Sequence, residues 1–161
     1  MENLGSTPDT VFQELRDSYG IGPSEEVDTL KIAHTYDPKK DLHVFGNPAP
    51  DGVYEIRLDF PEFTSLCPKT GQPDFATVSI NYSPDELCVE MKSLKLYLQS
   101  FRNEGHFYEE ITNMVHKDLL KVLDPLVLQT VFSFNARGGM PVDVAIEYTR
   151  PSEEDKPDGQ E

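Results

Sequence analysis

Residues 53–60 read VYEIRLDF, and residues 75–82 read FATVSINY. In both segments apolar side chains alternate with charged or polar ones. The apolar series are Tyr54, Ile56, Leu58 and Phe60 in the first, and Ala76, Val78, Ile80 and Tyr82 in the second. A period of two predicts strands with one buried face. The short run LCVEM, residues 87–91, is predicted to extend the second strand or to pair with it after the turn SPDE.

A change of period follows these strands. In SLKLYLQSFRN, residues 93–103, the apolar positions recur with helical spacing, and a second helix is predicted over about 107–123. Asp124-Pro125 ends this helix, because the residue before a proline disfavours the helical conformation. Two more strands, LVLQTVFSF (126–134) and PVDVAIEY (141–148), are joined by NARGGM. This order predicts an α+β fold: an antiparallel sheet with two helices on one face. The two open edges of such a sheet favour association.

The rest of the chain sets the limits of this unit. We expect residues 1–52 to form an extended N-terminal arm with a short helix near 10–19, residues 53–150 to form the domain, and the acidic tail 151–161 to be disordered. A net charge of −15 argues against broad contact with nucleic acid or an acidic membrane. Since neither a membrane span nor a signal-peptide core is evident, we expect a soluble cytoplasmic protein.

The loop CPKTGQPDF, residues 67–75, places Cys67 and Asp74 between two strands. Loops held by a rigid sheet often carry reactive groups, and a free thiol is a good nucleophile. The same pattern also fits a cysteine without a chemical role beside an aspartate that caps a turn. Cys88 alternates within a strand, which favours a packing role. The two cysteines and four histidines show no spacing typical of a metal site, so none is predicted.

Four stretches together resemble the single-domain 7-cyano-7-deazaguanine reductases, the QueF family. They are CPKTGQPDFATV, VEMKSLKLYLQSFRN, FYEE and ARGG, and the similarity spans roughly residues 53–148. The resemblance implies the tunnelling fold, related to GTP cyclohydrolase I. It also implies a homo-oligomer, a ring or double ring, in which subunits join edge to edge into barrels and active sites lie between subunits.

The activity that this resemblance implies is a reduction. The nitrile of 7-cyano-7-deazaguanine becomes the primary amine of 7-aminomethyl-7-deazaguanine, with NADPH as cofactor, in the biosynthesis of the tRNA base queuosine. Cys67 would attack the nitrile carbon to form a covalent thioimide, and Asp74 would protonate the nitrogen. A thioimide accepts hydride more readily than a nitrile and stays in place during the transfer.

The same resemblance implies the binding residues. The substrate would contact Val89, Glu90, Met91, Tyr108 and Glu109. One carboxylate, Glu109, can accept from the ring N–H and the amino group of a guanine-like edge. Tyr108 stands where relatives commonly have histidine, and His106 lies nearby. NADPH would contact Lys92, Lys95, Arg137 and Gly138, whose charge or small size suits phosphate groups.

Two other functions fit part of the pattern. A relative that forms the thioimide could pass it to ammonia or water and yield an amidine or amide without NADPH. The basic stretch EMKSLK argues against that reading. The second alternative is a deazapurine-binding module without turnover, which would not need the thiol of Cys67.

Overall fold

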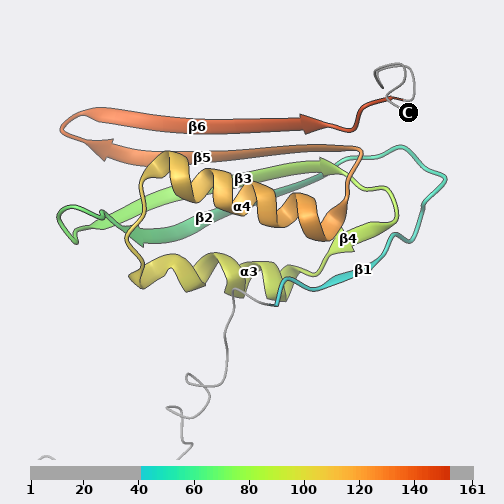
Figure 1. Ribbon diagram of the computed structural model, residues 1–161, viewed down its shortest axis with the longest axis horizontal. Helices are drawn as coiled ribbons and strands as arrows, with labels where there is room; N and C mark the ends of the chain where they lie inside the picture. The colour runs from blue at the N-terminus through green and yellow to red at the C-terminus, as the bar shows by residue number, and fades with distance from the viewer. Residues whose placement is uncertain (1–40, 153–161) are drawn as a thin grey trace, which may run out of the picture. The chain divides into compact units, whose positions relative to one another are not determined.

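An antiparallel sheet in the order β2-β3-β5-β6 carries helices α3 and α4 on one face (Figure 1). This computed structural model describes residues 41–152, which belong to one compact unit. The helix expected near residues 10–19, and the tail beyond residue 152, lie outside the described residues. The elements are β1 (Val44–Gly46), β2 (Ile56–Leu66), β3 (Pro73–Ser83), β4 (Leu87–Val89), α3 (Met91–Ser100), η2 (Phe101–Asn103), α4 (Tyr108–Leu123), β5 (Val127–Arg137) and β6 (Met140–Thr149).

The alternation predicted for the central strands is confirmed by their burial. Along β3 every second side chain, from Asp74 to Tyr82, is buried, and its neighbours are at least partly exposed. The buried side chains of β3 and β5 face the helices and form the core with Tyr97, Phe101 and Leu119. Removing this apolar surface from water is the main stabilising contribution to the fold.

Local chemistry sets the ends of the helices. The carboxylate of Glu90 accepts hydrogen bonds from the backbone N–H groups of Lys92 (2.8 Å) and Ser93 (2.7 Å), which caps the start of α3. Helix α4 ends at Leu123, where Asp124 adopts the left-handed conformation (φ 41°) before a proline. The end predicted for this helix is therefore confirmed. Neither helix within residues 41–152 is long and apolar enough to cross a membrane.

The expected pairing of residues 87–91 was wrong. Strand β4 pairs with β1 rather than with β3, with Phe45 opposite Cys88, and Met91 belongs to α3. Strand β4 ends at Val89 because the next residue, Glu90, caps helix α3. Cys88 and Val89 are buried, so their backbone groups need hydrogen bonds from a partner strand. That partner comes from residues expected in the arm: Val44–Gly46 form β1, which makes a separate two-stranded sheet with β4.

The two ends of the sheet carry different groups of elements (Figure 1). At one end lie the loop between β2 and β3, the hairpin between β5 and β6, and the start of α4. At the other end lie β1, β4 and the start of α3. This arrangement decides which candidate residues can meet within one chain.

Candidate active site

Cys67 lies at the start of a tight loop between β2 and β3. Its backbone N–H donates to the Gln72 carbonyl (2.8 Å), and its carbonyl accepts from the Gly71 N–H (2.9 Å). Gly71 has a φ of 68°, a conformation that glycine adopts without steric cost. These bonds fix the backbone on both sides of the thiol, so the sulfur is held in a defined position.

Hydrogen-bond donors surround the Cys67 sulfur. The Thr70 hydroxyl, the backbone amides of Lys69 and Thr70, and the Arg137 guanidinium lower the pKa of the Cys67 thiol to about 7. Each donor stabilises the thiolate relative to the thiol. The Thr70 oxygen itself accepts from the Gln72 N–H at 3.3 Å, an interaction that orients it. A substantial fraction of this thiol is therefore ionised near neutral pH.

Asp74 is a buried carboxylate at the start of β3, with a side chain that is 2% exposed. Its Oδ1 accepts a hydrogen bond from the Tyr108 phenol at 2.7 Å and forms an ion pair with Arg137. Charged groups are buried at low cost only when such partners are present. Two donors from separate elements thus hold the position of the carboxylate.

Tyr108 is the first residue of α4, and its ring stacks on Phe134 with centroids 3.8 Å apart and an interplanar angle of 11°. Burial, followed by the bond to Asp74, raises the pKa of Tyr108 to about 12. The phenol therefore stays protonated and remains a donor at neutral pH. Tyr108, rather than His106, occupies the place beside Asp74.

These groups line a cavity of about 310 Å³. Its lining residues are Cys67, Pro68, Asp74, His106, Phe107, Tyr108, Glu109 and Arg137. Five of them, Cys67, Asp74, Tyr108, Glu109 and Arg137, were predicted as site residues from the sequence. The cavity thus joins the expected nucleophile and acid to two expected substrate residues and one expected cofactor residue.

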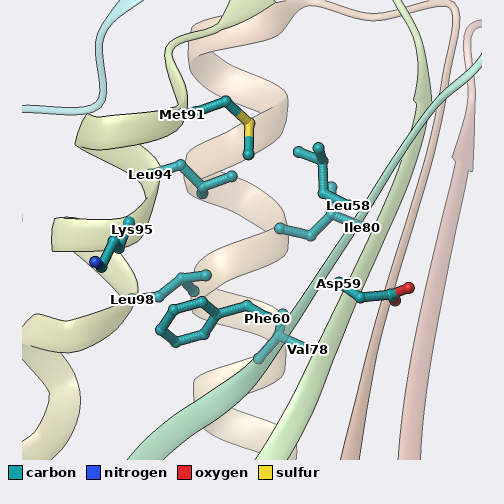
Figure 2. A pocket seen from close by; sticks show the side chains of 9 residues that line it. All are labelled: Leu58, Asp59, Phe60, Val78, Ile80, Met91, Leu94, Lys95 and Leu98. Carbon is teal, nitrogen blue, oxygen red and sulfur yellow. The ribbon is translucent and has the colours of Figure 1, made fainter.

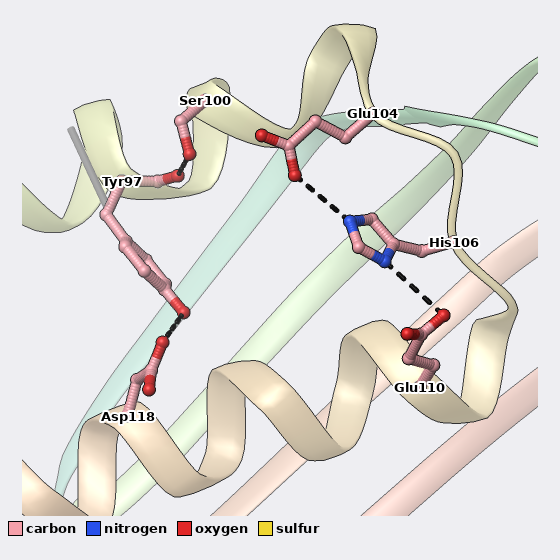
Figure 3. A network of polar contacts seen from close by, with 6 residues as sticks. All are labelled: Tyr97, Ser100, Glu104, His106, Glu110 and Asp118. Carbon is pink, nitrogen blue, oxygen red and sulfur yellow. Dashed lines mark hydrogen bonds and ion pairs between the residues drawn. The ribbon is translucent and has the colours of Figure 1, made fainter. Parts of the chain in front are cut away.

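His106, another lining residue, has a carboxylate near each ring nitrogen. Its Nε2 lies 3.0 Å from Glu104 Oε2 and its Nδ1 lies 3.4 Å from Glu110 Oε2 (Figure 3). The ring also packs edge-on against Phe101. Because both nitrogens face carboxylates of its own segment, His106 forms part of the cavity wall and does not contact Asp74 in this arrangement.

The remaining predicted residues lie elsewhere. Val89, Glu90, Met91 and Lys92 lie around the start of α3, at the opposite end of the sheet, and Lys95 is one helical turn further along. Met91 and Lys95 help to line a separate apolar hollow of about 50 Å³ between α3 and the strands β2 and β3 (Figure 2). Gly138 lies in the hairpin after β5 with a φ of 57°, and nothing lies within 4 Å of the place where a Cβ would be. A single chain does not bring the residues around the start of α3 to the Cys67 cavity. Gly138 follows Arg137 at the same end of the sheet as the cavity but does not line it.

Two residues beside the site were not found from the sequence. Thr70 contacts the Cys67 sulfur, but a threonine in a polar loop carries no distinctive signal. Ser65 pairs with Asp74 across β2 and β3, and its buried hydroxyl has no hydrogen-bond partner within the described part of the chain. Only the strand register reveals that Ser65 and Asp74 are neighbours. No cluster of metal-ligating side chains is present among residues 41–152.

The fold is shared with a solved protein. The crystal structure of the archaeosine synthase QueF-Like matches 61% of this chain and 96% of its own chain, with a TM-score of 0.56 at 20% sequence identity. The match shows the tunnelling fold. Together with the cavity, it defines a class of protein: a tunnelling-fold domain in which a loop cysteine with a lowered pKa lies beside a buried carboxylate.

Sequence comparison identifies the family within that class. The family model described as "QueF-like protein" matches residues 73–153. An NADPH-dependent 7-cyano-7-deazaguanine reductase of Nitrosococcus oceani is 51% identical over 114 residues, which cover 71% of this chain and 88% of the relative. A protein of the same name from Thermomicrobium roseum is 50% identical over 116 residues, 72% of this chain and 91% of the relative. The chain belongs to the QueF family of NADPH-dependent 7-cyano-7-deazaguanine reductases.

Proposed function

We propose that this protein reduces the nitrile of 7-cyano-7-deazaguanine to a primary amine with NADPH, through a covalent bond to Cys67. The observation that carries the proposal is the shared cavity: the Cys67 thiol and the Asp74 carboxyl line one 310 Å³ space. The relatives that are about half identical to this chain carry the name of that activity.

The first step is an addition without a leaving group. The sulfur of Cys67 forms a bond to the nitrile carbon, one π bond of the nitrile breaks, and its electron pair goes to nitrogen. The thiol proton reaches that nitrogen by way of Asp74, so the product is a neutral thioimide. The pKa of about 7 provides thiolate for the attack, and Asp74 lies within the same cavity to transfer the proton.

The lowered pKa of Cys67 serves the later step as well. Once the carbon has been reduced, the bond to sulfur must break to release the product. A thiolate whose conjugate acid has a pKa near 7 departs more readily than one with the ordinary value. Attack and release are thus both supported by the donors around the sulfur.

Two substrate contacts are proposed at the rim of the cavity. Glu109 is exposed, lines the cavity and has room to accept two hydrogen bonds from a guanine-like edge. The exposed ring of Phe107 lies next to it in the lining and offers a flat apolar surface. These side chains would orient the heterocycle so that its nitrile points to Cys67.

The residues proposed for NADPH fit a polyanionic ligand in part. Lys92 and Lys95 are exposed on one side of α3, one turn apart, so their ammonium groups can bind phosphates together. The backbone N–H groups of Lys92 and Ser93 already donate to the Glu90 carboxylate. The phosphates of NADPH would therefore be bound by the lysine side chains rather than by the helix amides. When bound, NADPH supplies hydride to the carbon held by Cys67, and two hydrides are needed for each nitrile.

A complete site requires a second copy of the chain. In one chain the start of α3 lies at one end of the sheet, and the loop between β2 and β3 lies at the other (Figure 1). Cys67 belongs to that loop, and the proposed reaction needs it together with α3. Strands β2 and β6 each have one neighbour in the described sheet, so their free edges can join copies. We infer a homo-oligomer in which α3 of one subunit closes the cavity of the next.

Two measurements test the proposed function. The purified protein should consume NADPH in a manner that depends on the nitrile. With nitrile but no NADPH, intact-protein mass spectrometry should show an addition equal to the whole substrate mass, located on Cys67. Cys67→Ala should abolish both signals, and Cys88→Ala, which alters the other cysteine, should retain them. Product formed without NADPH would favour the amidine or amide reaction, and binding without any adduct would favour the non-catalytic module.

A further inference from the structure

Arg137 lies at the junction between the two reactive side chains. It is the last residue of β5, and the following glycines, with φ values of 57° and 83°, turn the chain back into β6. Its Nη2 forms an ion pair with Asp74 Oδ1 and lies 3.4 Å and 3.3 Å from the carbonyl oxygens of Gln72 and Pro73. Three acceptors from residues 72–74 therefore hold the guanidinium beside the start of β3.

The guanidinium also contacts the nucleophile. A hydrogen bond between Arg137 and the Cys67 sulfur is the main reason why the pKa of Arg137 is raised. The same bond contributes, after those from Thr70 and the loop backbone, to the lowered pKa of Cys67. One cation is thus shared between the sulfur and the carboxylate.

This arrangement has an electrostatic consequence for the pair. A thiolate and a carboxylate in one cavity carry like charges and repel each other. A guanidinium between them offsets this repulsion and, because its donors are fixed in a plane, also fixes their relative position. The Nη2 atom held in this way serves the reaction centre, a role different from the contact with NADPH that the resemblance to the family implied for Arg137.

We propose that Arg137 is a positioning residue of the reaction centre, whose guanidinium holds the Cys67 sulfur and the Asp74 carboxylate together before NADPH binds. This inference rests on the proposed function, since it assigns Cys67 as the nucleophile. It predicts a defect in the chemistry of the free enzyme, whereas a role confined to cofactor binding predicts a defect only when NADPH is present.

The test is the alkylation of Cys67 by iodoacetamide as a function of pH, with neither nitrile nor NADPH present. The modified residue is located by peptide mass spectrometry. The parent protein should show a half-maximal rate near pH 7. Arg137→Met should move the midpoint upward and slow alkylation at neutral pH by about two- to fivefold, because less thiolate is present. Arg137→Lys should restore part of the rate.

Matched variants calibrate the measurement. Arg57→Met removes an exposed arginine that pairs only with Glu55 among the described side chains, and it should leave the alkylation profile unchanged. Thr70→Val removes another donor to the sulfur without touching Asp74, and it should also raise the midpoint. Circular dichroism of each variant checks that the fold is retained. If Arg137→Met does not fold, the alkylation midpoint of Cys67 is measured in Arg137→Lys instead.

The rate of adduct formation from the nitrile, again without NADPH, is the second readout. Arg137→Met should slow it. An unchanged alkylation profile and adduct rate, combined with a raised KM for NADPH, would overturn the inference and leave the proposed function intact. Failure of the parent protein to consume NADPH with the nitrile would overturn the proposed function instead, while the alkylation profiles would still report on Arg137.

Discussion

The phenol of Tyr108 donates a 2.7 Å hydrogen bond to Oδ1 of Asp74, from the first turn of α4 to the start of β3. The ring is held in place by its stacking on Phe134. Since burial and the bond to Asp74 raise the pKa of this phenol to about 12, it donates throughout the neutral range. A helix and two strands thereby meet at one carboxylate.

Replacement of Tyr108 by phenylalanine tests this bond. Tyr108→Phe keeps the ring that stacks on Phe134 but removes the donor to Asp74. We expect kcat to fall about tenfold, the scale of a lost hydrogen bond to a charged group, with little change in KM for the nitrile. Steady-state kinetics measures both. Tyr108→Ala serves as the comparison, since it also loses the stacking and should be less stable. A Tyr108→Phe enzyme with the parental kcat would show that the bond is not needed.

The pH dependence of adduct formation follows from the pKa of Cys67. Its folded value is lowered to about 7 by hydrogen bonds from Thr70, the loop backbone and Arg137. Because the thiolate is the nucleophile, the rate should be nearly constant above this pH. Well below it, the rate should fall about tenfold per pH unit. Rapid-quench mass spectrometry without NADPH gives the profile. A rate that is still rising steeply above pH 8 would show an unperturbed thiol.

Affinity for the substrate should depend on Glu109. We expect Glu109→Ala to weaken binding by about 1.5–3 kcal/mol, the scale of hydrogen bonds to a charged group. Titration calorimetry with the Cys67→Ala protein measures binding without the covalent step. Glu62→Gln, which alters an exposed acid on β2 away from the cavity lining, is the matched control. Equal affinity in the Glu109→Ala and control proteins would remove Glu109 from the site.

A mixture of two inactive variants tests the composite site. Cys67→Ala lacks the nucleophile, and a Lys92→Ala/Lys95→Ala double variant lacks the proposed anion contacts on α3. If a site takes its cavity from one subunit and α3 from another, unfolding and refolding the two proteins together should restore part of the nitrile-dependent NADPH consumption. Each variant refolded alone is the control. A mixture no more active than its parts would indicate that each site is built from one chain.

Two buried hydroxyl groups should differ in their contribution to stability. The Tyr97 hydroxyl donates to Asp118 at 2.6 Å (Figure 3), so Tyr97→Phe should lower the free energy of unfolding by about 1–3 kcal/mol. The Ser65 hydroxyl has no partner within the described residues, so Ser65→Ala should change stability little or raise it by about 1 kcal/mol. Urea denaturation measures both. A large loss of stability in Ser65→Ala would reveal a partner for this hydroxyl in the assembled protein.

Much of the fold could be predicted from local pattern. The period of two in residues 75–82, the helical spacing of residues 93–103 and the helix stop at Asp124-Pro125 each depend on residues close together in the sequence. The pairing of β4 could not be predicted this way. Its partner β1 lies far earlier in the chain and has only three residues, too few to show a period.

The sequence by itself determined the order of the four sheet strands and two helices, the family, and the spacing of seven residues between a cysteine and an aspartate. Only the tertiary structure decided that Tyr108 and Arg137 meet at Asp74. Strand register is the reason: Ala76 opposite Phe134 brings the end of β5, and with it Arg137, beside the start of β3. Register arises from packing between distant segments, which no short stretch of sequence encodes.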